Sequence, residues 1–217
     1  MTEKTTVMLV DDHSVVRAGY RLLLSQTNDI TVLSEAERGE DACQFYCRQR
    51  PTVVVLDLSL PGIGGLATIK RLRLRDPEAK ILVFSMHDET VYISRTMAAG
   101  ARGYISKSCP PETLIEAVRQ VARGEIFIEP KLAQKLAVVA SRNVNPTTPL
   151  QSLSGREFDV FRLAAAGHTT RAIADSLHLS SKTVANHLTA IKNKLRANTS
   201  AELTRLAYTA GILKEGF

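Results

Sequence analysis

The sequence predicts an α/β fold, a doubly wound five-stranded parallel sheet, followed by a small all-α domain of four helices. In the first part of the chain, short apolar runs alternate with segments of helical periodicity. One run, Val53 to Asp57, is β-branched and apolar up to its last residue, as in strands that helices cover on both faces. After residue 150 helix-capping motifs replace the strand pattern, which predicts the second, helical domain.

The first domain repeats one unit, a strand followed by a helix. Its five predicted strands are short and apolar and span residues 7–10, 30–33, 53–57, 81–84 and 103–105. Its five predicted helices carry apolar residues at helical spacing and span residues 14–26, 40–50, 66–75, 89–99 and 111–123. Gly100 and Gly124 end two of these helices, and Pro110-Pro111 starts the last. Such alternation implies parallel strands between two helical layers.

A polar segment separates the two domains. Residues 126–128 close the first domain, and residues 131–140 are compatible with one further helix. The segment Ser141–Ser152 is rich in Asn, Thr and Pro and almost free of apolar side chains, which is typical of an interdomain linker. We therefore expect a first domain over residues 1–128, a linker that can include a helix over 129–152, and a second domain over 153–217.

Capping motifs define the helices of the second domain. Each motif starts with a hydroxyl residue, and two of them have a glutamate three residues later: Ser154-x-x-Glu157, Ser180 and Thr199-x-x-Glu202. The predicted helices span residues 155–167, 171–177, 181–195 and 200–210. The middle pair has the spacing of a helix-turn-helix, whose second helix can enter the major groove of DNA. Any small helical bundle shares that spacing.

Charge divides unevenly between the two parts. Residues 1–129 contain 16 Lys+Arg and 17 Asp+Glu, a net of −1, whereas residues 130–217 contain 12 and 5, a net of +7. A nearly neutral module joined to a basic one is expected when the second part binds nucleic acid, although basic tails can also serve solubility. The three cysteines form no C-x-x-C motif, which favours a reduced, intracellular protein. Neither a membrane-spanning stretch nor a signal-peptide pattern is expected.

Polar residues stand where four of the predicted strands end. They are three acids, a hydroxyl and an ammonium: Asp11, Asp12, Asp57, Ser85 and Lys107. Because the carboxyl ends of parallel strands meet at one edge of a sheet, where α/β proteins bind ligands, we expect these residues to form one site. The alternative is that each residue caps its own strand.

In their order and strand-end positions, these five residues and Tyr104 resemble the functional set of a two-component receiver domain. The second domain resembles a LuxR-type helix-turn-helix at Leu153-Ser154-x-Arg156-Glu157, Gly167, Ile173-Ala174, Leu179, Ser181-x-Thr183-Val184 and His187. The two resemblances together cover nearly the whole chain. A receiver followed by this type of helix-turn-helix resembles the NarL/FixJ class of response regulators. That class implies a flavodoxin-like sheet with strand order 2-1-3-4-5.

The resemblance implies a phosphorylation-controlled, DNA-binding transcription regulator rather than an enzyme. Asp57 would accept a phosphoryl group from a sensor histidine kinase, and Lys107 and Ser85 would contact phosphoryl oxygens. Tyr104 would be a rotamer switch that follows Ser85 inward, although a lone aromatic residue beside a strand is more simply a packing residue. The protein would act in the cytoplasm.

The resemblance also implies a Mg²⁺ cofactor. Asp12, Asp57 and the backbone carbonyl of Ser59 would ligate the ion, and Asp11 would act mainly through water. Ligands that are all oxygen atoms suit this hard cation, which keeps several of its waters.

The candidate DNA contacts lie in helices 171–177 and 181–195. Candidate phosphate contacts are Arg171, Lys182, Thr183, Lys192 and Lys194. Candidate contacts to base edges or thymine methyl groups are Ala185, Asn186, Thr189 and Ala190. His187 is a candidate backbone contact, with a packed or capping histidine as the alternative. The implied partner is double-stranded promoter DNA, bound by a homodimer of the phosphorylated or DNA-bound chain, with RNA polymerase as a further partner and no membrane contact.

The sequence departs from the family pattern at three places. Ser108 follows Lys107, where receivers often carry a proline after a cis peptide; a cis peptide before another residue costs about 3 kcal/mol. Ala185 and Asn186 stand where relatives commonly have a charged or bulkier residue and a β-branched residue, so their operator sequence cannot be carried over. The third place is the pair His87 and Asp88 after Ser85, which is not diagnostic of the family.

Two other functions fit parts of the sequence. A Mg²⁺-dependent phosphatase with an aspartyl nucleophile, similar to haloacid dehalogenases, usually needs a second acid two residues after Asp57, where Ser59 stands. The second alternative is a receiver with a helical tail that binds protein or RNA. The tail lacks an aromatic platform, which argues against single-stranded RNA. Phosphate release over many turnovers would favour the enzyme, whereas sequence-specific DNA binding would favour the regulator.

Overall fold

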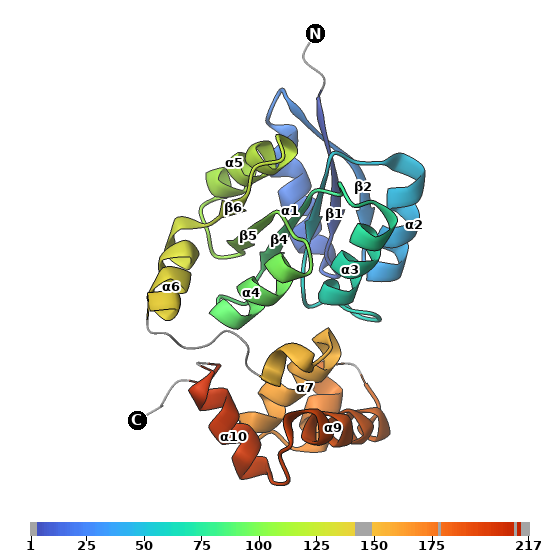
Figure 1. Cartoon of the computed structure of the whole chain (residues 1–217). Helices are drawn as coiled ribbons and strands as arrows, with labels where there is room; N and C mark the ends of the chain where they lie inside the picture. The colour runs from blue at the N-terminus through green and yellow to red at the C-terminus, as the bar shows by residue number, and fades with distance from the viewer. Residues whose placement is uncertain (1–3, 142–148, 178, 211, 214–217) are drawn as a thin grey trace. The chain divides into compact units, whose positions relative to one another are not determined.

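The computed structural model describes residues 4–141, 149–177, 179–210 and 212–213. Most of the expected linker, residues 142–148, and His178 of the expected helix-turn-helix connection lie outside the described residues. The chain separates into two compact units, Met1–Arg142 and Asn143–Phe217. We describe each unit by itself (Figure 1).

The first unit is built on a parallel sheet in the order β2-β1-β3-β4-β5-β6. Its strands are β1 Thr5–Val10, β2 Ile30–Ala36, β3 Val53–Leu56, β4 Ile81–Ser85, β5 Gly103–Ser106 and β6 Phe127–Ile128. The five predicted strands and their order are confirmed. The sixth, a two-residue strand, extends the edge beside β5 and was not predicted as a strand, because two residues are too few to show an alternating pattern.

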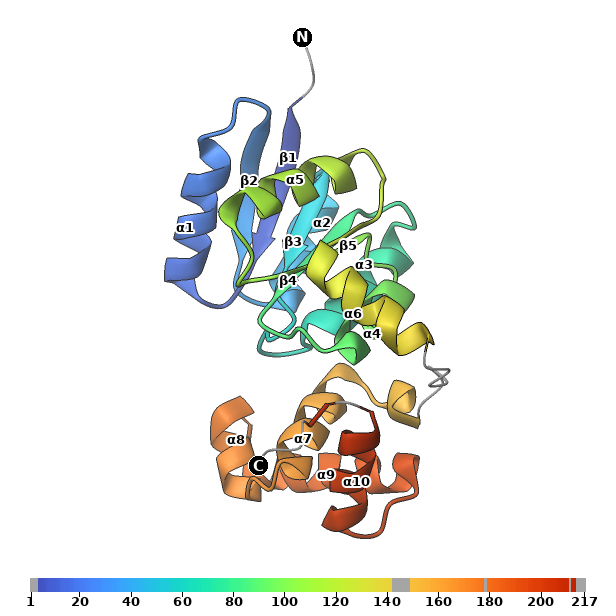
Figure 2. The ribbon, with the colours of Figure 1, turned by 90° about the vertical axis from the view of Figure 1, so that its left-hand side faces the viewer.

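Helices cover both faces of this sheet, as the doubly wound prediction requires. They are α1 Ser14–Ser25, α2 Gly39–Gln49, α3 Gly65–Arg75, α4 Thr90–Ala98 and α5 Pro111–Ala122. Figure 2 shows α5 in front of the sheet and α1 to its left, and the apolar sides of both helices pack on strand residues such as Leu9, Val55 and Phe84. With α2, α3 and α4 on the other face, β3 is buried along its whole length.

The parallel register brings the ends of the central strands together. Val10 of β1 pairs with Leu56 of β3, and Leu56 pairs with Val83 of β4. The backbone amide of Asp57 donates to the carbonyl of Val10 at 2.9 Å, and that of Lys107 donates to the carbonyl of Ser85 at 2.9 Å. The residues that follow these strands therefore stand side by side at one edge.

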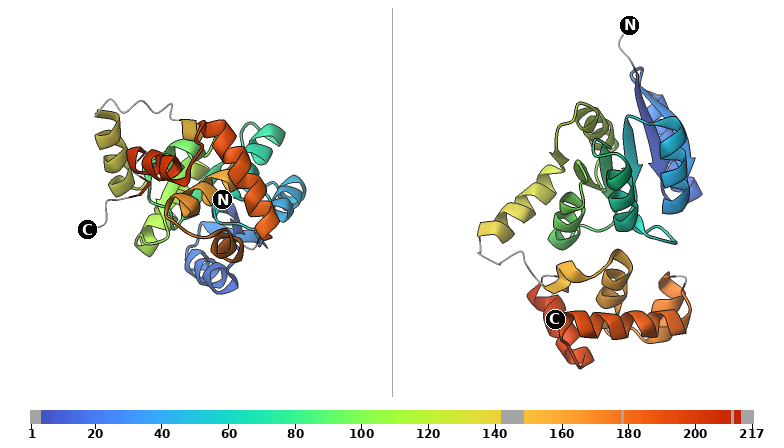
Figure 3. Two further views of the ribbon diagram at one scale, coloured as in Figure 1. Left: turned by 90° about the horizontal axis from the view of Figure 1, so that it is seen from below. Right: turned by 45° about the vertical axis from the view of Figure 1, so that its right-hand side comes forward.

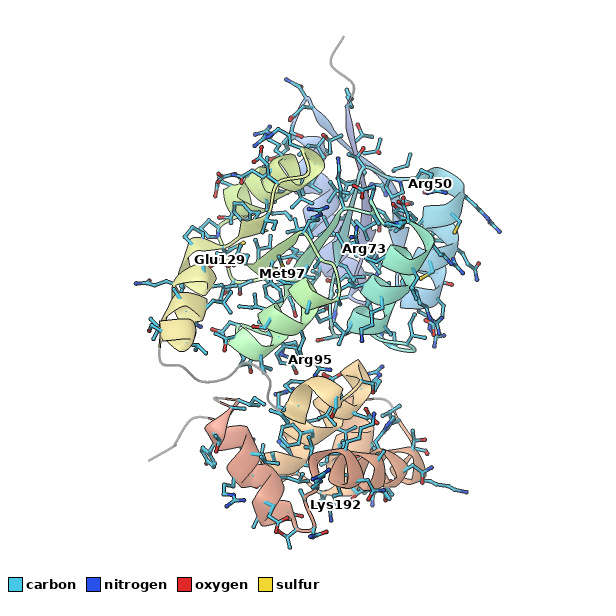
Figure 4. The ribbon with its side chains drawn as sticks, viewed as in Figure 1. Arg50, Arg73, Arg95, Met97, Glu129 and Lys192 are labelled. Carbon is cyan, nitrogen blue, oxygen red and sulfur yellow. The ribbon has the colours of Figure 1, made fainter. Side chains whose placement is uncertain are left out.

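A helix does form in the segment expected to join the domains. It is α6, Pro130–Ser141, and it packs against α4. Figure 4 shows Glu129 at its start, where the carboxylate accepts a hydrogen bond from the backbone amide of Ser106 at 2.9 Å. Lys135 of α6 binds the carboxylate of Asp88 in the loop before α4. Helix α6 is therefore anchored on the first unit.

The regular elements in the described part of the second unit are all helical. It contains a 3₁₀ turn at Pro149–Ser152 and the helices α7 Gly155–Ala165, α8 Thr170–Leu177, α9 Ser181–Leu195 and α10 Ser200–Thr209. Helix α9, the longest with 15 residues, is seen along its length in the right-hand view of Figure 3. The predicted capping box of Ser154 and Glu157 is present, and Ser180 and Thr199 cap α9 and α10. The predicted helical domain is confirmed.

Among the helices of the described residues, none is both long and apolar enough to cross a lipid bilayer.

Candidate functional site

Acidic side chains gather at the carboxyl edge of the sheet. Asp11 and Asp12 follow β1 and Asp57 follows β3, so the strand register places their carboxylates together. One ligand atom from each of these residues and from His13 lies within 4.8 Å of the others. Asp11 and Asp57 are buried, whereas the side chain of Asp12 is 29% exposed. Buried carboxylates this close together need a compensating positive charge.

Lys107 supplies part of that charge. It follows β5, and its Nζ lies 2.6 Å from Oδ2 of Asp11 and 2.7 Å from Oδ2 of Asp57. Burial alone would lower the pKa of the Lys107 ammonium, but the two carboxylates outweigh it and hold the pKa above its ordinary value. The ammonium is therefore a fixed cation between the two acids. The Lys107–Ser108 peptide is trans, since no described peptide bond is cis.

Within the described part of the chain, a buried carboxylate oxygen of Asp57 has no hydrogen-bond partner. Oδ1 of Asp57 is buried and accepts no hydrogen bond from the described residues, while Oδ2 binds Lys107. A buried carboxylate oxygen is normally satisfied, so this atom indicates a missing donor or cation. With Asp11 and Asp12 beside it, the ligand set is rich in oxygen and fits Mg²⁺. The acidic pocket is typical of a Mg²⁺ site.

The turn after Asp57 is shaped by glycine. Gly64 has φ +76°, a left-handed conformation that favours glycine. A Cβ atom on Gly65 would lie 2.5 Å from the carbonyl oxygen of Asp57, so only glycine allows α3 to start this close to β3. The turn leaves Ser59 exposed near the acids, and its Oγ lies 3.3 Å from Nε2 of His87.

Ser85 and Tyr104 meet at the loop after β4. Both are fully buried. The Tyr104 hydroxyl donates to the backbone carbonyl of His87 at 2.7 Å, and the His87 amide donates to Oγ of Ser85 at 3.3 Å. The His87 ring stacks on Tyr92 of α4, with centroids 4.1 Å apart. Burial, with the nearby Glu89 carboxylate, raises the pKa of the Tyr104 hydroxyl, so it stays a neutral donor.

Sequence reasoning missed the position of His87. Its backbone joins the two residues expected to act as a switch, and its ring joins α4 to the turn that carries Ser59. A histidine next to a strand end is common, and nothing in the local pattern shows which distant side chains it contacts.

Most of the candidate DNA contacts lie on the solvent side of α8 and α9. The exposed ones are Arg171, Lys182, Ala185, Asn186 and Thr189, and the half-buried ones are Thr183, His187, Ala190 and Lys192. Figure 4 places Lys192 on α9. Val184, Ile191 and Leu195 of the same helix are buried, so opposite sides of α9 serve the core and the solvent.

Lys194 differs from the other candidate contacts. Its Nζ lies 2.8 and 2.6 Å from the two carboxylate oxygens of Glu157 at the start of α7. Burial alone would raise the pKa of Glu157, but hydrogen bonds from Lys194 and Ser154 outweigh it and keep the pKa below its ordinary value of 4.5. The ion pair fastens the carboxyl-terminal end of α9 to α7.

A parallel sheet with three acids and a lysine at one edge, followed by a helix-turn-helix bundle, defines the class of phosphoacceptor proteins that carry a DNA-binding domain. Residues 7–119 match the family model described as "Response regulator receiver domain". Residues 151–207 match the model described as "Bacterial regulatory proteins, luxR family". The two matches fall in the two compact units.

Named relatives resemble the chain over nearly its full length. The transcriptional activator protein ExaE of Pseudomonas putida is 41% identical over 209 residues, which cover 96% of this chain and 98% of that protein. The response regulator GacA of Pseudomonas aeruginosa is 35% identical over 95% of this chain and 97% of its own. The structure of RcsB from Salmonella enterica serovar Typhimurium, bound to a promoter with the phosphomimetic BeF3-, has a TM-score of 0.64 at 25% identity and covers 94% of this chain and 98% of that one.

The chain belongs to the two-component response regulators that join a receiver domain to a LuxR-type helix-turn-helix, the NarL/FixJ class. It is a transcription regulator that binds DNA through the helix-turn-helix, and its family is not one of enzymes. The predicted resemblance is confirmed, and the phosphatase alternative is excluded.

Proposed function

We propose that Asp57 accepts a phosphoryl group from a sensor histidine kinase and that the acyl phosphate controls promoter binding. The observation that carries this is the free, buried Oδ1 of Asp57, held among Asp11, Asp12 and Lys107. A carboxylate oxygen attacks phosphorus as the phosphorus–nitrogen bond of the phosphohistidine breaks, which leaves an acyl phosphate on Asp57.

Each neighbour of Asp57 has a separate role in this proposal. Asp12, Asp57 and the Ser59 carbonyl hold Mg²⁺, with Asp11 acting mainly through water, and the ion supplies charge neutralisation when bound. Lys107 transfers one of its hydrogen bonds from a carboxylate to a phosphoryl oxygen.

The signal then leaves the site through Ser85. Its hydroxyl donates to a second phosphoryl oxygen, and the move of the side chain toward the phosphoryl group lengthens the hydrogen bond that its Oγ accepts from the His87 amide. Because Tyr104 is bonded to the carbonyl of the same residue, the loop before α4 and the buried tyrosine respond together. Helix α6 is tied to this loop by Asp88 and Lys135, so it is the element that carries the change toward the linker.

The DNA-binding surface is the exposed side of α9. We propose phosphate contacts from Arg171, Lys182, Thr183 and Lys192, and base contacts from Ala185, Asn186, Thr189 and Ala190, with His187 at the backbone. Lys194 is assigned first to its ion pair with Glu157. Two chains bind two half-sites as a homodimer. Residues 1–128 and 153–217 act as the two domains, and within the segment 129–152 that joins them α6 is packed on the first domain. RNA polymerase is a further partner, and the protein works in the cytoplasm beside its promoters.

Phosphorylation with a small donor tests the acceptor. Incubation with acetyl phosphate and Mg²⁺ should modify one residue, which peptide mass spectrometry identifies as Asp57. Asp57→Asn should abolish the modification, and excess chelator or Asp12→Ala should suppress it without unfolding the domain, because the apolar strands hold the fold. Full modification of Asp57→Asn would contradict the acceptor, and a normal rate in excess chelator would contradict the metal.

A further inference from the structure

We propose that Arg17 is a positioning residue for the Mg²⁺ site, acting through the backbone of Asp11. This inference rests on the proposed function of the acidic pocket and adds a residue behind it. Arg17 lies in the first half of α1 and is only 7% exposed. Its ion pairs among the described residues are with Glu35 and Glu37 and not with the acids of the pocket. A buried guanidinium is costly to desolvate, so its contacts explain why it stays inside.

The first contact is with a metal-site residue. Nη1 of Arg17 donates to the backbone carbonyl of Asp11 at 2.6 Å, and this hydrogen bond is buried. The carboxylate of the same residue binds Lys107 on one oxygen and the His13 amide on the other. Arg17 therefore fixes the peptide from which the Asp11 and Asp12 side chains leave β1.

The other contacts anchor the guanidinium at the end of β2, to one glutamate inside the strand and one just after it. Nη2 of Arg17 lies 2.7 Å from Oε1 of Glu37, and Nε lies 3.3 Å from Oε2 of Glu35. Between these two glutamates, the carbonyl of Ala36 accepts a hydrogen bond from the Asp11 amide at 3.1 Å. Both sides of the Asp11 backbone are thus tied to the end of one neighbouring strand.

The geometry of the side chain explains why arginine is needed. Three separate nitrogen atoms point to three different acceptors, and only a planar guanidinium holds such a fork. Lysine would keep the charge but could not span the carbonyl and both glutamates. Without the fork, the turn after β1 gains freedom, and binding of a cation must then include the cost of ordering it.

Loss of the Arg17 contacts should first of all weaken the binding of Mg²⁺. Outer residues that orient metal ligands typically contribute about 10–100-fold in affinity. We expect Arg17→Met to raise the Mg²⁺ dissociation constant of the whole chain about 10-fold. Methionine fills a similar volume without a buried charge, but it leaves the Asp11 carbonyl and the two glutamates without their donor, so we expect the urea midpoint to fall. Mg²⁺ binding is therefore measured without denaturant, where we expect the variant to be folded.

The experiment is a Mg²⁺ titration followed by amide NMR shifts of the full chain, with no phosphoryl donor present. Arg21→Met is the matched control, because Arg21 lies on the same helix, binds Glu35 at 3.1 Å and is largely exposed. It should bind Mg²⁺ like the wild type. Arg17→Lys should remain as weak as Arg17→Met, because the fork and not the charge is responsible.

Each result has one meaning. A wild-type dissociation constant for Arg17→Met would overturn the inference, and recovery by Arg17→Lys would show that charge alone acts. If Arg17→Met does not fold, the variant Glu37→Gln is used instead. Glu37 is exposed, so its substitution loosens the contacts of Arg17 without removing a buried group. About 3-fold weaker Mg²⁺ binding is expected, and no change in affinity would overturn the proposal. A wild-type chain that does not bind Mg²⁺ would instead contradict the proposed function.

Discussion

Lys107 shares its charge between Asp11 and Asp57. In the proposed function, a phosphoryl group on Asp57 would compete for that charge. We predict that Lys107→Ala still accepts the phosphoryl group, because Mg²⁺ held by Asp12 and Asp57 would supply the charge neutralisation that the attack needs. The variant should transmit the signal poorly, since its ammonium no longer fixes the phosphorylated geometry. The measurement is the ratio of DNA affinities with and without acetyl phosphate. An unchanged ratio would show that Lys107 has no part in signalling.

Two residues of α9 should behave differently toward DNA. Asn186→Ala should relax discrimination at one or two base pairs by about 1–3 kcal/mol, as expected for a bidentate base contact. Lys192→Ala should weaken binding to all sequences alike. It should also lower the slope of the logarithm of the binding constant against the logarithm of salt concentration by roughly one unit. Binding curves for matched and mismatched sites at several salt concentrations separate the two. Uniform loss in both variants would mean that Asn186 does not read bases.

At the scale of residues, the members of the acidic pocket could be predicted from the sequence, but the buried or paired charges that hold each unit together internally, such as Arg17 and Lys194, could not. Asp57 and Lys107 end apolar runs, and the parallel register then brings them together. Arg17 and Lys194 carry charges that sequence patterns assign to the surface, because each is held by acids distant in the chain. Such pairs depend on tertiary packing, which no local period encodes.

The pair of Glu157 and Lys194 makes the second unit sensitive to acid. The pKa of the Glu157 carboxyl is lower in the folded unit than its ordinary value of 4.5, so protonation favours unfolding. Its stabilisation is complete above pH 4.5 and is lost as the pH falls through the folded value. At pH 7, Glu157→Gln should be less stable by about 1–2 kcal/mol through loss of charged hydrogen bonds.

Thermal unfolding of the second unit between pH 7 and pH 3 measures this effect. The difference in stability between the wild type and Glu157→Gln should shrink as the pH falls. A difference that stays constant over the whole range would show that the ion pair does not contribute to acid sensitivity. The comparison uses the difference because other acids of the chain also titrate in this range, and their contribution is the same in both proteins.

At the scale of elements, caps and strand ends were predicted more reliably than short edges. The helix starts at Ser154, Ser180 and Thr199 follow from side-chain chemistry that acts within one turn. The two-residue strand β6 depends instead on pairing with β5, and the anchoring of α6 depends on Lys135 and Asp88, which are far apart in the chain.

At the scale of the whole molecule, the basic unit should be restrained by the receiver before phosphorylation. The fragment Pro149–Phe217 should bind DNA without a phosphoryl donor and more tightly than the unphosphorylated whole chain, because removal of the receiver raises the competent fraction. Both affinities are compared at one salt concentration. Equal affinities would mean that control acts through receiver-driven dimerisation rather than restraint.

The division into two units follows from composition. The chain divides between Arg142 and Asn143, within the polar stretch that the sequence marks as a linker. The net charge of +7 after residue 129 agrees with the assignment of DNA binding to the second unit. Operator sequence could not be predicted, because Ala185 and Asn186 differ from the pattern common in the family.

The central claim is that a phosphoryl group on Asp57 controls DNA binding by the second unit. Its most direct test is the affinity of the whole chain for one promoter fragment, with and without acetyl phosphate and Mg²⁺, measured in parallel for Asp57→Asn. We predict that the donor tightens binding of the wild type and has no effect on Asp57→Asn. Equal tightening of both proteins, or no change in the wild type despite full phosphorylation of Asp57, would contradict the claim.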